Sequence, residues 1–198
     1  GHTASDEDAF SGGATTVFVT ERGVVLVDSK LPGWGPRLAD LVRTVTDKPV
    51  TTIINTHAHV DHTGSNDFFN ASVESIAHEN ARAHMLLGEA FPGASAKILP
   101  KRTFRDTLTL FSGKAQADLY YFGAGHTNGD VWVVFPALRV MHAGDIFARK
   151  GAPVIDPIAG GSIVALPQTL SRAAAALQYV DTIVTSHDGL LTRKDLLD

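Results

Sequence analysis

Residues 53 to 64 read IINTHAHVDHTG, which places three histidines and an aspartate within six positions, directly after an apolar run. Packing does not call for three imidazoles and a carboxylate on one short loop, so these groups must be solvated, paired or bound to an ion. Imidazole and carboxylate are both ligands of divalent transition metals. The loop that carries His57, His59, Asp61 and His62 therefore indicates a metal site.

Three further candidate ligands stand where other strand-like runs end. His126 follows YYFGAG, Asp145 follows LRVMHAG and His187 follows IVTS. Strand ends on one edge of a sheet converge in space, so these loops can meet the histidine loop at one site. A lone histidine is more often a satisfied surface or core residue. On that ground four histidines are assigned no ligand role: His2, His78, His84 and His142.

Seven candidate ligands are too many for a single ion. One tetrahedral zinc takes about four ligands, one of which is usually water at a catalytic site. Five imidazoles and two carboxylates suit two ions about 3.5–4 Å apart, with a carboxylate and a water or hydroxide between them. This set fits zinc, and also iron or manganese. The sequence has no cysteine, which excludes thiolate ligands and disulfide bonds.

The composition is that of an ordinary globular chain. Its 198 residues are 44% apolar and 19% charged. No apolar run approaches the roughly eighteen residues that span a bilayer. A net charge of −4 with scattered basic residues argues against a nucleic-acid partner. The expected partner is a small-molecule substrate.

Residues 1–12 are expected to be a tag remnant and flexible segment, and residues 13–198 one domain. Compartment and oligomeric state are left open.

Strand-like and helix-like segments alternate along the chain, and hairpin-like pairs among them indicate an α/β (α+β) fold with mixed sheets. Each half contains a hairpin that ends in aspartate (VVLVDS, VMHAGD), then a helix, then a strand that ends in histidine (IINTH, IVTSH). Two such halves packed sheet against sheet would form a four-layer sandwich. The expected elements are a hairpin over 15–28, helices over 37–46, 78–87 and 167–180, strands over 50–55, 107–111, 117–122, 131–135, 138–142 and 182–185, and helices and loops over the remainder of 65–100.

The pattern HxHxDH at residues 57–62 resembles the metal-binding signature of the metallo-β-lactamase superfamily. GHTNGD with His126, HAGD with Asp145 and TSHDG with His187 follow in the family's order. The resemblance covers nearly the whole chain, from about Gly13 to Gly189. It implies a four-layer αββα metallo-β-lactamase sandwich, in which two mixed β-sheets are flanked by helices and the metals lie in a cleft at one edge of the sheets.

The resemblance also implies roles for the candidate ligands. It gives Asp61 a catalytic role as well, in orienting the nucleophile, and it makes Asp28, at the end of VVLVDS, a carboxylate that supports the histidine loop. The implied cofactors are two zinc ions. The first ion would be held by His57, His59 and His126 and the second by Asp61, His62 and His187, with Asp145 bridging them.

The expected activity is hydrolysis, in which a metal-bridging hydroxide attacks the carbonyl of a small ester, lactone or amide. With an aspartate at position 145, the chain resembles the family members that carry aspartate there, which are glyoxalase II, acyl-homoserine lactonases and many phosphodiesterases. One alternative is a true or promiscuous class B-like β-lactamase, although a large subclass of these enzymes has cysteine where Asp145 stands. The other alternative is a persulfide dioxygenase-like oxidoreductase, which uses one iron held by two histidines and one aspartate.

Substrate contacts are expected from loops around the cleft. Trp34, between glycines and prolines, and Phe91, in FPGAS, are candidate walls. A core-anchoring aromatic is the alternative interpretation of Trp34. Lys150 is a candidate partner for a substrate carboxylate, with a solvated charge as the alternative, and Asn128 is a further candidate contact.

Overall fold

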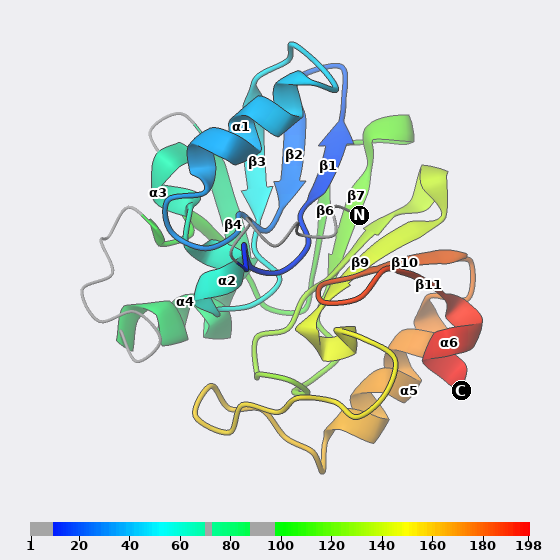
Figure 1. The fold of residues 1–198 in the computed structure, drawn as a ribbon. Helices are drawn as coiled ribbons and strands as arrows, with labels where there is room; N and C mark the ends of the chain where they lie inside the picture. Colours follow the sequence, from blue (N-terminus) through cyan, green and yellow to red (C-terminus); the bar gives the residue numbers. More distant parts are fainter. Residues whose placement is uncertain (1–9, 70–72, 88–97) are drawn as a thin grey trace.

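Two facing β-sheets with helices on their outer sides form the computed structural model, which describes residues 10–69, 73–87 and 98–198 (Figure 1). The first sheet has the strand order β1-β2-β3-β4-β5. Its first two strands are antiparallel and the others pair in parallel. The strands are β1 (Thr16–Val19), β2 (Val24–Val27), β3 (Val50–Ile54), β4 (Glu74–His78) and β5 (Arg102–Phe104).

The second sheet has the order β11-β10-β9-β8-β7-β6. Only β9 and β10 pair in parallel within it. Its strands are β6 (Thr107–Leu110), β7 (Ala117–Tyr120), β8 (Trp132–Phe135), β9 (Val140–Gly144), β10 (Thr182–Thr185) and β11 (Leu190–Thr192). The helices are α1 (Gly35–Arg43), α2 (Val60–Thr63), α3 (Asn66–Phe69), α4 (Glu79–Leu87), α5 (Leu166–Ala176) and α6 (Arg193–Leu197).

Three apolar layers hold the two sheets and the outer helices together. Alternate residues of a strand face opposite sides of its sheet, and β2 shows the result: Val25 and Val27 pack between the sheets, whereas Val24 and Leu26 pack against α1. On the other side, Trp132 of β8 packs with residues of α5. Both faces of each sheet are thus covered, which explains why VVLV is buried throughout. The structure confirms the predicted αββα arrangement of two mixed sheets flanked by helices.

Most predicted elements are present with shifted ends, but the interpretation of residues 65–100 as helices and loops is wrong for β4. This strand lies between two parallel neighbours, so its residues after Glu74 are all buried and lack the alternation that marks a half-exposed strand. The strand expected over 138–142 begins at Val140 instead, because Pro136–Leu138 form a 3₁₀ turn. The short elements β5, β11 and α6 were not predicted.

The predicted similarity of the two halves is confirmed in the topology. β2 pairs in parallel with β3, and β9 pairs in parallel with β10. Each pair ends in a carboxylate on one strand and a histidine-bearing loop on the other, which brings these loops to the same edge of the sheets. None of the helices among the described residues is long and apolar enough to cross a membrane.

Candidate metal centre

The histidine loop follows the end of β3 at Ile54 and leads into the short helix α2, which begins at Val60. His59 precedes the first residue of this helix, and its carbonyl accepts hydrogen bonds from the backbone of His62 (3.1 Å) and from the Thr63 hydroxyl (2.9 Å). The N-terminal segment crosses the loop, where the Gly13 amide donates to the Asp61 carbonyl (3.1 Å). The loop is therefore held by its own helix turn and by a strap from the chain's N-terminal side.

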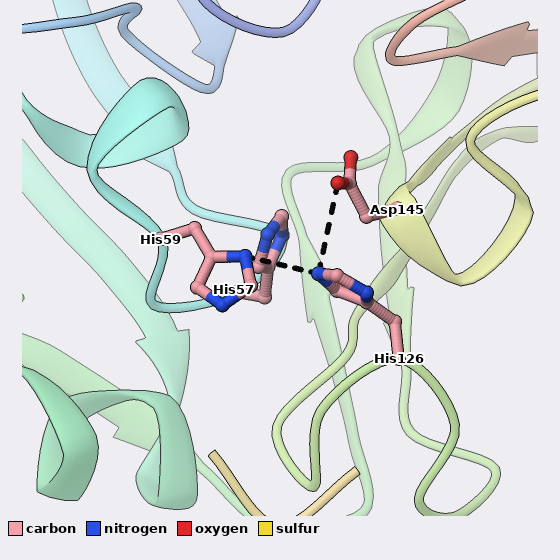
Figure 2. Close-up of side chains that lie close together, drawn as sticks. All are labelled: His57, His59, His126 and Asp145. Atoms are coloured by element: carbon pink, nitrogen blue, oxygen red, sulfur yellow. Dashed lines mark hydrogen bonds and ion pairs between the residues drawn. The ribbon is translucent and has the colours of Figure 1, made fainter. Parts of the chain in front are cut away.

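The structure brings all seven predicted ligands together at the edge of the sheets, in two adjoining groups. Within each group the candidate ligand atoms lie within 4.8 Å of one another. Figure 2 shows the first group, in which side chains from the histidine loop, the loop before β8 and the end of β9 converge. The first group is His57, His59, His126 and Asp145, and the second is Asp61, His62 and His187.

Asp145 lies between the two groups. One of its carboxylate oxygens is 3.2 Å from His62 Nε2, and the other is 3.3 Å from His187 Nε2 and 3.6 Å from His126 Nε2. The Ser186 hydroxyl donates a short hydrogen bond to this carboxylate and fixes its orientation. Asp145 thus contacts ligand atoms of both groups.

Hydrogen bonds on the outer side of two histidines determine which ring nitrogen faces inward. His126 donates from Nδ1 to the carbonyl of Val154 (2.9 Å), and His59 donates from Nε2 to the Asp156 carboxylate (2.7 Å). The other ring nitrogen of each residue faces inward, and these two atoms, His126 Nε2 and His59 Nδ1, lie 3.0 Å apart, within hydrogen-bond distance. Two ring nitrogens that face each other at this distance can both bind one cation.

Asp28 orients the other two histidines of the loop from beneath. It is fully buried and accepts hydrogen bonds from the Thr56 amide (2.8 Å), the Thr56 hydroxyl (2.8 Å) and His62 Nδ1 (2.7 Å). Because the Thr56 hydroxyl donates to Asp28, it accepts from His57 Nδ1 (3.0 Å). One carboxylate therefore contacts His62 directly and His57 through Thr56, and the supporting role of Asp28 stays a prediction that these contacts favour.

The inward nitrogens of these two rings provide a test of whether the site fits a metal. His57 Nε2 is buried and has no hydrogen-bond partner among the described residues. His62 Nε2 is also buried and makes no regular hydrogen bond among them; its nearest carboxylate oxygens belong to Asp145 (3.2 Å) and Asp61 (3.4 Å). Leaving a buried polar atom unpaired costs about 1–3 kcal/mol. A cation in the centre would satisfy both atoms, and histidine with carboxylate is a donor set that zinc, iron and manganese accept. The residues present fit a metal.

The charges of the centre support the same conclusion. Burial alone would raise the pKa of Asp145, but the nearby rings of His187 and His62 hold it well below its usual range. Hydrogen bonds with Asp145 and Asp61 raise the pKa of His187 to about 9. Burial opposes a charge on His62, yet the carboxylate of Asp28 raises its pKa well above the ordinary value. In the metal-free chain, protons thus supply the positive charge that the carboxylates require.

Two glycines are required by the close packing around the centre. A Cβ atom at Gly13 would lie 2.2 Å from Cε1 of His62. Gly144 has φ +56°, a conformation that favours glycine, and a Cβ there would lie 2.7 Å from the Thr56 side chain. Backbone from the N-terminal strap and from the end of β9 therefore approaches the ligands as only glycine permits.

The residues predicted to contact the substrate do not converge on the candidate metal ligands. Trp34 is half-buried and precedes the first residue of α1, and Lys150 donates to Asp195 of α6 (2.8 Å). The side-chain oxygen of Asn128 accepts a hydrogen bond from His84 of α4 (2.9 Å). None of these contacts reaches the seven ligands. Phe91 lies outside the described residues.

Three residues near the ligands were missed by sequence reasoning. Asp156 bonds to His59, Ser186 bonds to Asp145, and the ring of Phe10 stacks on His187 with centroids 5.9 Å apart. One signal could have found Asp156, because it is the only charged residue between Lys150 and Arg172. Ser186 and Phe10 carry no such signal. The N-terminal boundary predicted at residue 12 stays a prediction, although Ser11 already bonds to Leu31 (3.1 Å).

Comparison with known proteins agrees with this geometry. The family model described as the metallo-beta-lactamase superfamily matches residues 9–187. Metallo-beta-lactamase IND-1 of Chryseobacterium indologenes is 26% identical over 175 residues, which cover 86% of this chain and 69% of the relative. The type 2 metallo-beta-lactamase of Bacillus cereus is 25% identical over 193 residues, 90% of this chain and 69% of the relative.

Solved structures show the same fold. A metallo-beta-lactamase from Pontibacter korlensis aligns with a TM-score of 0.78 at 20% identity and covers 93% of this chain and 89% of its own. The enzyme from Erythrobacter litoralis aligns with a TM-score of 0.76 at 21% identity, over 93% and 82% of the two chains. With the family match over almost the whole length and the two His/Asp groups at the sheet edge, the chain belongs to the metallo-β-lactamase superfamily and is a metal-dependent hydrolase.

Proposed function

We propose that the protein binds two zinc ions and hydrolyses a carbonyl substrate, a small ester, lactone or amide. The observation that carries this proposal is the position of Asp145, whose oxygens lie within 3.2–3.6 Å of histidine nitrogens from both ligand groups. A carboxylate in that position is what a pair of adjacent ions requires as a bridge.

Each ion would have its own set of ligands. His57, His59 and His126 would hold the first, and Asp61, His62 and His187 the second. Two zinc ions bound there would supply a hydroxide at neutral pH and would polarise the substrate carbonyl. Iron or manganese fits the same donor atoms.

The chain's own residues would orient the reaction. Asp61 is partly exposed, and its Oδ2 lies 3.4 Å from both His62 Nε2 and His187 Nε2. Burial would raise the pKa of Asp61, but the nearby rings of His187 and His62 lower it, so its other oxygen can accept a hydrogen bond from the attacking water. This supports the catalytic role predicted for Asp61.

The alternatives differ in substrate and in metal count. Relatives named metallo-beta-lactamase match most of the chain at 24–26% identity, which favours β-lactam hydrolysis as a second candidate. A dioxygenase with one iron on two histidines and one aspartate would leave four of the seven converging side chains unused. We therefore place hydrolysis ahead of oxygen chemistry.

The proposal is tested by stripping the protein with a chelator and restoring zinc, iron or manganese separately. Each form is then assayed with p-nitrophenyl acetate, a small lactone and a chromogenic cephalosporin, with an Asp61→Asn variant in parallel. The expected result is hydrolysis that requires zinc and falls at least about a hundredfold in the variant. Oxygen uptake with a persulfide in the iron form, without hydrolysis in any form, would contradict the proposal.

A further inference from the structure

The loop between the end of β9 and the start of α5 exposes aliphatic side chains to an unusual degree. Residues 151–165 contain a single charged residue, Asp156, which is engaged with His59. Isolated exposed aliphatic residues are ordinary on a protein surface, but several on one loop mark an interaction surface. The exposed fractions are 52% for Val154, 74% for Ile158, 60% for Ile163 and 88% for Val164. We call these four residues the apolar rim.

Hydrogen bonds hold the backbone of the loop that carries the apolar rim beside the metal centre. Val154 accepts from His126 through its carbonyl (2.9 Å), and the Asp156 amide donates to the His126 carbonyl (2.8 Å). Further along, the Asn128 amide donates to the carbonyl of Ala159 (3.0 Å) and the Ser162 amide to that of Gly125 (2.9 Å). Residues 154–162 thus run along the loop that carries His126. Figure 1 shows this yellow-to-orange segment between the end of β9 and α5.

Residues 151–165 contain no cation that could pair with a substrate. The one carboxylate of this loop, Asp156, is held by His59 and by the amides of Ile158 (2.9 Å) and Ala159 (3.2 Å). Lys150, the nearest cation before it in the sequence, is paired with Asp195 of α6. A ligand that lies over the apolar rim therefore meets aliphatic carbon and backbone rather than charge.

We propose that the apolar rim binds an aliphatic chain of the substrate, so that the preferred substrates are neutral acyl compounds whose chain extends from the scissile carbonyl. This inference rests on the proposed function, because the carbonyl must lie at the metal centre for its chain to reach the neighbouring loop. The rim binds this chain by removing apolar surface of both partners from water. The scissile group can be an ester, a lactone or an amide.

The test is a series of p-nitrophenyl esters from acetate to octanoate, hydrolysed by the zinc-loaded full chain. Full burial of one methylene changes a binding constant about fourfold. On an open loop the methylene is buried only in part, and about half of that free energy is expected. The expected change in kcat/KM is therefore about twofold per added methylene. Over the six methylenes from acetate to octanoate, the expected ratio of kcat/KM is roughly sixtyfold.

Variants link this ratio to the apolar rim. Ile158→Ser and Val164→Ser together are expected to lower the octanoate-to-acetate ratio at least about fivefold. Leu138→Ser is the matched control, because Leu138 is also an exposed aliphatic residue (57%) but lies before the start of β9, at the strand end opposite to Asp145. It should leave the ratio unchanged. A wild-type ratio near one, or a ratio that the double variant retains, would overturn the inference.

A second measurement does not depend on turnover. 1-Octanol added to the zinc-loaded protein should shift the backbone amide resonances of residues 151–165, and ethanol at the same concentration should not. Shifts confined to other regions would overturn the inference, as would a concentration-dependent dimer that the double variant abolishes, since the rim would then bind a second copy. If none of the esters is hydrolysed, the proposed function fails instead, and the octanol experiment still tests the rim separately.

Discussion

Replacing Asp28 by asparagine tests how the centre is held, because one buried carboxylate orients two ligands. Asp28 accepts from His62 Nδ1 (2.7 Å), from the Thr56 amide (2.8 Å) and from the Thr56 hydroxyl, which in turn accepts from His57. Asparagine keeps the size and one acceptor oxygen, but its amide group donates. The amide must then face a donor, either His62 Nδ1–H or Thr56.

The consequence falls on metal binding. If the amide faces His62, the ring proton moves to Nε2, the ring atom that faces Asp145 and Asp61 in the centre. A protonated nitrogen cannot bind a metal. Loss of such a supporting carboxylate typically lowers metal affinity 10- to 100-fold, or about 1.4–2.7 kcal/mol. We expect Asp28→Asn to fall within this range.

The assay is competition for zinc between the protein and a chromophoric chelator at neutral pH. Asp118→Asn is the matched control, because Asp118 is also a buried carboxylate with side-chain donors, Thr109 (2.6 Å) and Gln116, but lies on β7 outside both ligand groups. A loss of less than threefold in Asp28→Asn, or an equal loss in Asp118→Asn, would refute the reasoning.

Two further predictions follow from the packing and the charges. Gly13→Ala places a Cβ 2.2 Å from the His62 ring, so zinc affinity and kcat should both fall at least about tenfold. Chelator competition measures the affinity, and the esterase assay measures kcat. A variant with wild-type zinc affinity would contradict the close approach of Gly13 to His62. In the zinc-free protein, the pKa of His187 is raised to about 9, so the protonated ring stabilises the fold. This stabilisation is fully present below pH 6.5 and is lost as the pH rises through 9. His187 alone should therefore lower the free energy of unfolding in urea by at most about 3 kcal/mol between pH 6.5 and 9, and a rise of this free energy over that window would contradict the assignment.

The convergence of the candidate ligands could be predicted from the sequence because four of them follow strand-like runs. His57, His126, Asp145 and His187 all follow such runs, and the strand ends converge as parallel pairing requires. The position of these residues relative to local elements is a short-range property. The sequence therefore indicated which side chains meet.

The supporting contacts could not be predicted in the same way. The bond between Asp156 and His59 joins residues 97 positions apart through a loop without periodicity. β4 was misread because burial on both faces removes the alternation by which a strand is recognised. Lys150 and Asn128 carry suitable chemistry, yet their partners Asp195 and His84 lie on helices whose packing is set by the tertiary fold.

The most direct test of the central claim is the zinc content per chain after dialysis against a low concentration of free zinc, for the wild type and for Asp145→Ala. Because Asp145 contacts both ligand groups, we predict about two zinc ions per wild-type chain and a clear loss in the variant, together with its hydrolytic activity. One ion per chain, unchanged in Asp145→Ala, would contradict the two-metal account.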